Sequence, residues 1–486
     1  MDEKRLIDER IRNEALKSRV TTPGEAARLV NDGDVVGMSG FTGVGYPKAF
    51  PRALAERAEN GEKIGITLLT GASTGEDLDG VLSRAGVIKR RYPYQSSKDL
   101  RDRINSGEIK YVDIHLSQLP IMVKRGIFGK VNLAVVEAAA ITEEGNIVPT
   151  ASVGAANTFV EYADQVVVEI AAAIPAESEG IHDIYTSEKV PNTKPIPILA
   201  PGDRIGTTYI PCDPDKIAAI VFSDRVDGNV ELKPADAEQQ KIAEHLIGFL
   251  KKEVEAGRLT DPLPPLQSGV GGVANAVLSC LAASDFTDLT VNTEVMQDAV
   301  VDLINAGKVK TASATALTIS PSRKKEVFDH IADFKDTLIL RPQEISNSPE
   351  VVARLGVIAM NTAIEADLSG NVNSTHIGGT RMMNGLGGSG DFARNAGLTI
   401  FSTASTAKGG KLSCIVPVVS HVDHTEHDVD VIITEQGTAD LRGLTAFERA
   451  ELIIENCAHP DFKPELRAFL ERAKSKTPMG HGIIAE

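Results

Sequence analysis

The chain has 486 residues, of which 42% are hydrophobic and 24% are charged, and its formal net charge is −16. That length allows two or three domains, and that composition is typical of a globular protein. The negative charge argues against a nucleic-acid partner, whose phosphates require a basic surface, and no apolar run approaches the roughly 18 residues of a membrane span.

The amino-terminal stretch and the cysteines indicate the cellular compartment. The stretch MDEKRLIDERIRNEALKSR lacks the apolar core of a signal peptide and the acid-poor character of a transit peptide. The cysteines are widely spaced and form no CxxC pair, which excludes the pattern of a disulfide framework or a zinc ribbon. We therefore expect a cytoplasmic protein with reduced thiols at Cys212, Cys280, Cys414 and Cys457.

The first half of the chain alternates predicted helices and strands. A helical period covers residues 6–31, and a buried strand at 34–40 then ends in a glycine-rich turn at 41–47. A proline-rich segment at 191–214 has no clear period and predicts a loop, whereas residues 236–257 predict a charged amphipathic helix. Other predicted elements are a helix at 48–57 and strands at 64–70, 110–114, 131–136 and 164–170.

The second half repeats features of the first. The sequence VEA at 136–138, followed by GN at 145–146, corresponds to IEA at 364–366, followed by GN at 370–371. Each half also carries a glycine-rich turn, and the shared order of features predicts two similar α/β domains with mostly parallel open sheets. We place the N-terminal domain at residues 1–228 and the C-terminal domain at 229–486.

The stretch from residue 264 to 307 contains the strongest candidate for chemistry. A glycine-rich turn at 269–272 opens a predicted helix at 273–281, and a short strand at 289–293 is followed by Glu294. Ligands of open α/β sheets bind outside the carboxyl ends of the strands, and a helix amino terminus can hold a phosphate. We therefore interpret Glu294 as a candidate catalytic carboxylate near a phosphate-binding turn.

Glu435 occupies a similar position, directly after the β-rich run DVDVIIT. A single glutamate at a strand end is by default structural. Asn347 lies in a Ser-Asn-Ser-Pro turn, however, and Lys408 lies in a glycine-rich loop. Together with Glu294, these residues indicate a pocket with carboxylates, amide donors and a cation for a phosphate.

Two glycine patterns fit the fingerprint of dinucleotide-binding folds. Gly269–Ala274 reads G-x-G-x-x-A, and Gly385–Gly390 reads G-x-G-x-x-G. The fingerprint requires a preceding strand, and neither pattern is directly preceded by an apolar strand in the prediction. We favour tight turns, or close backbone approach to a different ligand, over a nicotinamide site.

A serine motif, G-x-S-x-G, surrounds Ser73 between a predicted strand and a predicted helix. A serine hydrolase also needs an aspartate and a histidine, and no histidine of the chain carries a recognisable partner motif. A glycine- and serine-containing turn that lines a pocket is the favoured interpretation.

The spacing His421-x-x-His424-x-x-His427 is compatible with metal ligation. The surrounding residues predict a polar loop, and no H-E-x-x-H motif accompanies the histidines. We favour polar loop histidines and expect no metal.

Several long motifs resemble the acetyl-CoA hydrolase/transferase family. In the second half these are QSGVGGVANAVL, NTEVMQDA, ISNSPE, MNGLGGSGDFAR, STAKGGK, VSHVDHTEHDV and ITEQGTADLRGL. In the first half they are SGFTGVGYPKAFPRALA, LLTGASTGEDLDG, EGIHDIY and DPDKIAAIV. The resemblance covers nearly the whole chain and is greatest to the class I CoA-transferases that act on succinyl-CoA and acetate.

The resemblance implies two similar α/β domains per subunit, an active site at the domain interface, and a homodimer. It implies that Glu294 is the catalytic nucleophile. The backbone N–H of Gly388 is suited to stabilise the oxyanion, because glycine has no Cβ to prevent close approach. The stretch FSDRVDGN at 222–229 is less arginine-rich than in relatives, which leaves a nucleotide contact from Arg225 open. The implied CoA contacts are Gly269, Val270, Gly271, Gly272, Val273, Asn384, Gly388 and Lys408, and the implied carboxylate-substrate residues are Asn347, Glu435 and Ser73.

The implied reaction moves CoA from succinyl-CoA to acetate by a ping-pong mechanism through a glutamyl-CoA thioester. The substrates are acyl-CoA thioesters and short carboxylic acids, and no further cofactor is expected. One alternative is an acetyl-CoA hydrolase, or a transferase for propionyl, butyryl or 4-hydroxybutyryl groups, with the same nucleophile. Another alternative is a non-catalytic CoA-binding protein, which has no need for Glu294.

Overall fold

The computed structural model describes residues 3–191, 193–229, 231 and 234–476, and the chain forms two compact units. The predicted α/β class with mostly parallel sheets is confirmed, whereas the boundary between residues 228 and 229 stays a prediction. Among the described residues, no helix is both long and apolar enough to cross a membrane. The first unit comprises Met1–Glu231, Thr293–Met296 and Thr311–Val351, and the second comprises Leu232–Asn292, Gln297–Lys310 and Val352–Glu486.

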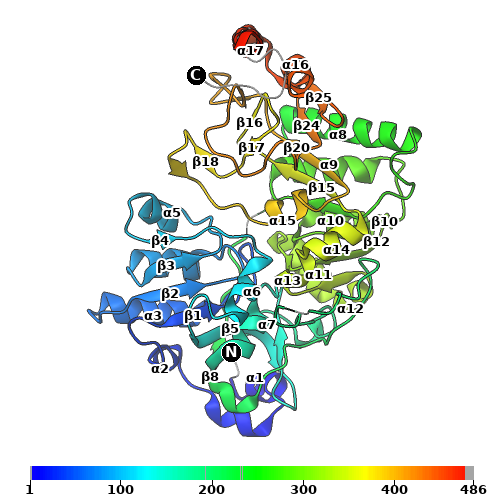
Figure 1. Ribbon diagram of the computed structural model, residues 1–486. Helices are drawn as coiled ribbons and strands as arrows, with labels where there is room; N and C mark the ends of the chain where they lie inside the picture. Colours follow the sequence, from blue (N-terminus) through cyan, green and yellow to red (C-terminus); the bar gives the residue numbers. More distant parts are fainter. Residues whose placement is uncertain (1–2, 192, 230, 232–233, 477–486) are drawn as a thin grey trace. The chain divides into compact units, whose positions relative to one another are not determined.

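A parallel sheet forms the centre of the first unit (Figure 1). Strand order reverses beside β1, because β2, β3 and β4 extend to one side of it and β5, β7 and β8 to the other. At such a reversal the loops that follow neighbouring strands diverge and leave room for a ligand. The strands, in spatial order, are β4 (Lys110–Tyr111), β3 (Ile88–Tyr92), β2 (Ile66–Leu69), β1 (Val35–Met38), β5 (Val131–Ile141), β7 (Ala163–Ala171) and β8 (Ile217–Ser223), with β6 (Ile147–Pro149) antiparallel to β5.

Helices cover both faces of this sheet. On one face α3 (Ala49–Glu59) packs into a core that includes Val36 and Met38 of β1. The intervening residue, Gly37, points to the other face, where a Cβ would lie 2.6 Å from Cγ of Phe159 in α7 (Ala156–Tyr162). Because side chains alternate along a strand, Gly37 lets α7 lie close to the sheet.

The predicted helical period at 6–31 is interrupted in the structure. Two helices, α1 (Glu3–Arg10) and α2 (Pro23–Ala27), flank a 3-10 turn at Glu14–Arg19. A capping box between Thr22 and Glu25 satisfies the first N–H groups of α2, so α2 begins as a separate helix. Within 191–213, the described residues contain no helix or named strand, in agreement with the predicted loop.

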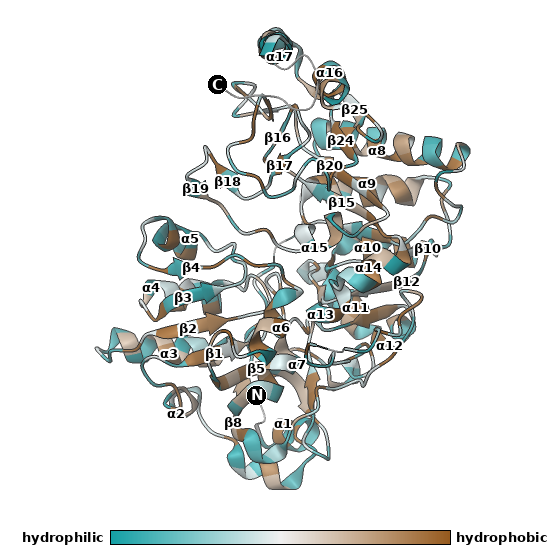
Figure 2. Ribbon diagram, in the orientation of Figure 1, coloured by the Kyte–Doolittle hydropathy of each residue, from teal (hydrophilic) through white to brown (hydrophobic). Residues whose placement is uncertain are grey.

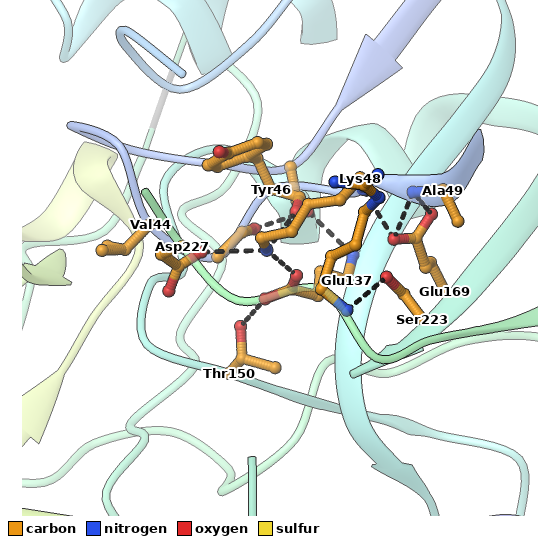
Figure 3. A network of polar contacts seen from close by, with 12 residues as sticks. Val44, Tyr46, Lys48, Ala49, Glu137, Thr150, Glu169, Ser223 and Asp227 are labelled. Atoms are coloured by element: carbon orange, nitrogen blue, oxygen red, sulfur yellow. Dashed lines mark hydrogen bonds and ion pairs between the residues drawn. The ribbon is translucent and has the colours of Figure 1, made fainter. Parts of the chain in front are cut away.

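A buried polar network supports the turn that follows β1 (Figure 3). The Lys48 ammonium forms ion pairs with Glu137, which is on β5, and with Asp227, at 2.9 Å from Oδ1. Glu137 also accepts a hydrogen bond of 2.7 Å from the Thr150 hydroxyl. Because the Lys48, Glu137 and Asp227 side chains are 1%, 1% and 3% exposed, their charges depend on one another rather than on water.

Glu169 of β7 anchors the start of α3 in the same network. Its carboxylate accepts hydrogen bonds from the backbone N–H groups of Lys48 and Ala49 (Figure 3) and also from that of Phe50, at 2.6 to 2.9 Å. These are N–H groups of the first turn of α3, which have no partner within the helix. A carboxylate there also interacts favourably with the helix dipole, so the turn enters α3 in one fixed direction.

The second unit is built on a second sheet, parallel except for the antiparallel pair β24 and β25. The predicted amphipathic helix is confirmed as α8 (Ala237–Glu255), which alternates between hydrophobic and hydrophilic segments in Figure 2. It packs against α9 (Gly272–Ala283), while α16 (Ala446–Cys457) and α17 (Lys463–Lys476) contribute to a core cluster with Phe401. The strands of this sheet that lie wholly in the second unit are, in spatial order, β10 (Leu289–Asn292), β9 (Leu266–Ser268), β15 (Ile358–Thr362), β20 (Leu398–Ser402), β24 (Val431–Thr434) and β25 (Gly437–Asp440).

Candidate active site

Glu294 lies in a backbone segment that is held on both sides. Its carbonyl oxygen accepts hydrogen bonds from the N–H groups of Thr315 at 3.0 Å and Ala316 at 3.3 Å. The N–H of the preceding residue, Thr293, donates to the Ser313 carbonyl. The next two residues form β11 (Val295–Met296), which pairs in parallel with β13 (Ala316–Leu317). The backbone therefore fixes the direction in which the Glu294 side chain leaves the chain.

Asn347 contacts the Glu294 carboxylate directly. Its Nδ2 donates to Oε2 of Glu294 at 2.9 Å, although 53 residues separate the two in sequence. Asn347 is fully buried and ends the short helix α13 (Gln343–Ser346). The Ser346 hydroxyl donates to Asn347 Oδ1 at 2.7 Å, which directs the NH₂ end of the amide toward Glu294. A charged acceptor strengthens such a bond and keeps the carboxylate oriented.

We expect Asn347→Ala to lower kcat/KM by about 10- to 100-fold, because a net hydrogen bond to a charged group is lost. Asn347→Asp should be more damaging than Asn347→Ala, since a second carboxylate would repel Glu294 and raise its pKa. Steady-state kinetics of both variants at neutral pH check this order. Near wild-type turnover of Asn347→Asp would show that turnover does not depend on the hydrogen bond from the Asn347 amide to Glu294.

The glycine turn at 269–272 connects β9 to α9 in the second unit. The Gly269 N–H donates to the Met360 carbonyl at 2.9 Å, and Gly271 has a φ of +119°, a conformation that side chains disfavour. A strand does precede this turn, contrary to the prediction, and it was missed because β9 has only three residues after a proline-rich stretch. The predicted helix is confirmed as α9. The side chain of Gln297, which no motif in the sequence indicated, contacts the turn.

Gly388, four residues after Asn384, is the N-cap residue of a short helix, α15 (Ser389–Ala393). Its carbonyl accepts hydrogen bonds from the N–H groups of Asp391 and Phe392, and because Gly388 is the N-cap residue its own N–H lies at the amino end of the helix. The Ser389 hydroxyl donates to the Leu386 carbonyl at 2.8 Å and so closes this loop on itself.

His424 is buried, so the prediction of a polar loop histidine is wrong for this residue. Its ring lies 4.6 Å from that of Phe401, and its Nε2 is 3.1 Å from the Ser389 hydroxyl. His421 and His427 are exposed. Within the part of the chain that the structure describes, no group of three His, Cys, Asp or Glu residues could hold a metal ion.

Glu435 follows β24 and is held by three donors. The Ser405 N–H donates to Oε2 at 2.8 Å, the Ser405 hydroxyl donates to Oε1, and Gln436 Nε2 donates at 2.9 Å. Burial raises the pKa of Glu435, but the hydrogen bonds from Ser405 and Gln436 outweigh burial and hold it below its usual value. Glu435 is therefore ionised at neutral pH and carries a fixed negative charge.

Lys408 lies in the turn between β21 (Thr406–Ala407) and β22 (Leu412–Ser413), and its φ is +51°. The turn and Glu435 line a common cavity of about 390 Å³. The structure thus places Glu435 on the same cavity as Gly409 and Gly410, the two residues that follow Lys408 in this loop. Other residues that line the cavity are Ala237, Glu238, Lys241, Gln436 and His459.

Ser73 and Arg225 lie in the first unit. Ser73 is buried, and its carbonyl accepts from the Gly43 N–H at 3.2 Å. Among the described residues no histidine hydrogen-bonds its hydroxyl, as a serine nucleophile would require. Arg225 pairs with Asp77 at 3.2 Å, on the wall of a cavity of about 490 Å³ that also includes Lys48.

Two family models match this chain. The acetyl-CoA hydrolase/transferase N-terminal domain matches residues 4–222, and the acetyl-CoA hydrolase/transferase C-terminal domain matches residues 324–470.

Curated relatives match over almost the whole chain. A succinyl-CoA:acetate CoA-transferase of Clostridium kluyveri is 52% identical over 96% of this chain and 87% of its own length. An acetyl-CoA hydrolase of Schizosaccharomyces pombe is 45% identical over 97% and 93%, respectively. A propanoyl-CoA:succinate CoA transferase of Escherichia coli is 44% identical over 95% and 94%.

Solved structures share the fold. RipA from Yersinia pestis superposes with a TM-score of 0.72 at 24% identity, over 98% of this chain and 100% of that one. A 4-hydroxybutyrate CoA-transferase from Porphyromonas gingivalis gives a TM-score of 0.65 at 23% identity, over 94% and 99%.

Proposed function

The chain belongs to the acetyl-CoA hydrolase/transferase family, and we propose that this enzyme moves CoA between succinyl-CoA and acetate. The proposal is supported by the relative at 52% identity and, above all, by one contact in the structure. That contact is the hydrogen bond from Asn347 Nδ2 to the Glu294 carboxylate. It orients an acidic side chain at the end of a strand, which suits a nucleophile.

In the proposed first half-reaction, a Glu294 carboxylate oxygen attacks the succinyl-CoA carbonyl. The C–S bond breaks, CoA leaves as a thiolate, and a mixed anhydride of succinate and Glu294 remains. The thiolate then attacks the Glu294 carbonyl, succinate leaves as a carboxylate, and a glutamyl-CoA thioester remains. Acetate reverses both steps, so acetyl-CoA leaves and the Glu294 carboxylate is restored.

Each step passes through a tetrahedral oxyanion that needs hydrogen-bond donors. We assign this role to the Gly388 N–H, where the missing Cβ lets a substrate approach the backbone. A donor of this kind is typically worth about 3 kcal/mol of barrier. Glu294 must be ionised to attack, and the Asn347 amide favours that form because it donates to the charged carboxylate.

The remaining predicted residues bind the substrates in this proposal. The turn at Gly269–Val273, with Asn384 and Lys408, holds CoA, and Lys408 supplies a local positive charge in a chain of net charge −16. Asn347, Glu435 and Ser73 contact the carboxylate substrate, and Arg225 stays a candidate for the nucleotide end of CoA. No metal or further cofactor takes part.

Subunit association and compartment are parts of the same proposal. We propose a homodimer that works in the cytoplasm. The support for a reducing compartment is that all four cysteines are free, two of them buried.

Hydrolysis of acetyl-CoA is the second candidate, because a relative named as such is 45% identical to this chain. Water would then attack either acyl intermediate in place of acetate. Transfer to propionate is a third candidate, since another relative is named for propanoyl-CoA and succinate. A non-catalytic CoA-binding protein is disfavoured, since it would not need the Glu294–Asn347 pair.

We expect succinyl-CoA consumption to depend on acetate. With acetate present, acetyl-CoA should form as fast as succinyl-CoA disappears, and without acetate little free thiol should be released. Chromatography of the CoA esters checks the first statement, and a thiol assay checks the second. Propionate, butyrate and 4-hydroxybutyrate, added as competing acceptors, test the acceptor specificity. Equal thiol release with and without acetate would favour the hydrolase.

A further inference from the structure

One buried side chain, Gln297, makes hydrogen bonds to two residues of the glycine turn between β9 and α9. Its Nε2 donates to the Gly269 carbonyl at 3.0 Å, and its Oε1 accepts from the Gly271 N–H at 3.2 Å. Gln297 is 5% exposed, so water competes little for these groups. A single amide therefore bridges two backbone groups that lie two residues apart.

The bridge requires a side chain with a donor and an acceptor on the same terminal group. Neutral amides provide this combination, whereas a carboxylate accepts only and an ammonium donates only. The turn also needs an external support, because glycine is conformationally permissive and Gly271 has the φ of +119°. Without the bridge, the N–H groups of the turn would sample several directions.

The position of Gln297 is itself well defined. It caps α10 (Asp298–Asn305) with an extended backbone, and its carbonyl accepts from the Val300 N–H at 2.9 Å. Helix α10 packs against α9, the helix that the glycine turn begins. Two helices and the amide bridge therefore restrict the turn.

We propose that Gln297 is the positioning residue of the CoA-binding turn. It sets the direction of the backbone groups at 269–271 and thereby the affinity for CoA, while it takes no part in bond making or breaking. Gln297 follows Glu294 by three residues, so one short stretch of sequence carries the nucleophile and the support of the CoA-binding turn. This inference rests on the proposed function, because it takes the turn to be the CoA site.

The test is CoA binding by the full-length protein, measured by calorimetry with CoA itself as the probe. Gln297→Met keeps the length and volume of the side chain and removes both hydrogen bonds. We expect the Kd for CoA to rise about tenfold, the effect of one to two net hydrogen bonds. In the assay, the KM for succinyl-CoA should rise similarly, while the KM for acetate and kcat change by less than about threefold, because a loss of uniform CoA binding raises KM and leaves kcat unchanged.

Gln297→Glu distinguishes positioning from general destabilisation. The ionised carboxylate can accept from Gly271 but faces the Gly269 carbonyl without a proton to donate. Protonation restores a donor, so CoA affinity should improve as the pH falls from 8 to 5.5 in this variant relative to wild type. A purely structural loss would not be restored by acid.

The matched control is Asn456→Leu, which removes another side-chain-to-backbone hydrogen bond of the second unit, from Nδ2 to the Thr438 carbonyl at 2.8 Å. It should lower the melting temperature as much as Gln297→Met does but leave the Kd for CoA unchanged. If Gln297→Met binds CoA as wild type does, the inference is wrong. If wild type itself does not bind CoA, the proposed function fails instead.

Discussion

Replacing Glu294 by alanine should abolish CoA transfer, with kcat/KM at least about 10⁴-fold lower than wild type. The reason is chemical, since alanine can form neither the mixed anhydride nor the glutamyl thioester. CoA binding should persist, because the proposed CoA contacts, the glycine turn and Lys408, are unchanged. Initial rates of acetyl-CoA formation and calorimetry with CoA check the two statements.

Glu294→Asp provides a graded control. It keeps a carboxylate but withdraws it by one methylene, and a misplacement of about 1 Å typically costs on the order of 10²-fold. Activity should therefore fall in the order wild type, Asp, Ala. A variant that had merely lost its fold would not show this order together with intact CoA binding.

The proposed covalent intermediate gives an independent check. Wild-type enzyme incubated with succinyl-CoA alone and then quenched should carry CoA on the peptide that contains residue 294. Borohydride should reduce that thioester and inactivate only enzyme that has been treated with the acyl-CoA. An adduct on another residue, such as Ser73, or residual transfer by Glu294→Ala within tenfold of wild type would contradict the assignment.

The sequence allowed the prediction of elements that local patterns define. Helix α8 has a clear amphipathic period, and β10 combines β-branched residues with a following turn. Glu294 could be proposed because it directly follows a strand, a position that any open sheet makes available. Strand β9 was missed, since three residues after two prolines carry too little pattern.

Contacts between distant parts of the chain could not be predicted in this way. The sequence placed Asn347 in a turn but gave no means of pairing it with Glu294, because no local period relates two residues so far apart. His424 was misjudged for the same reason, since its polar neighbours in sequence hid its packing against Phe401. Gln297 was overlooked because its partners, the backbone groups of Gly269 and Gly271, have no signature in a sequence.

The buried charges of the first unit were also invisible to sequence reasoning. Lys48 and Glu137 appear in ordinary helix and strand patterns, yet the structure buries both and pairs them (Figure 3). Transfer of two charges from water is costly, so such a pair adds little net stability by itself. Removal of one partner has a large effect, however, because the other charge is left buried and unpaired.

We therefore expect Lys48→Met to destabilise the protein by about 3–5 kcal/mol at pH 8. Methionine has a similar length, so the packing is largely retained. Asp227 keeps its ion pair with Lys324, whereas the Glu137 carboxylate, among the described residues, keeps only the hydrogen bond from Thr150. The apparent melting temperature, measured at one scan rate, should fall by roughly 10 °C.

The pH dependence of this variant identifies the cause. Burial, with the nearby charge of Asp227, raises the pKa of Glu137 above its usual value, and Lys48 opposes that rise. An acid whose pKa is higher in the folded state than in the unfolded state binds its proton more tightly when the protein is folded. Its contribution to stability is therefore present at low pH and is lost as the pH rises through the folded-state pKa. Loss of Lys48 raises that pKa further, and the destabilisation should therefore be small near pH 5 and largest near pH 8.

The double variant Lys48→Met with Glu137→Gln removes the unpaired charge and should recover at least half of the lost melting temperature at pH 8, with little dependence on pH. If the double variant is as unstable as the single one, packing around Lys48 rather than the stranded carboxylate is responsible.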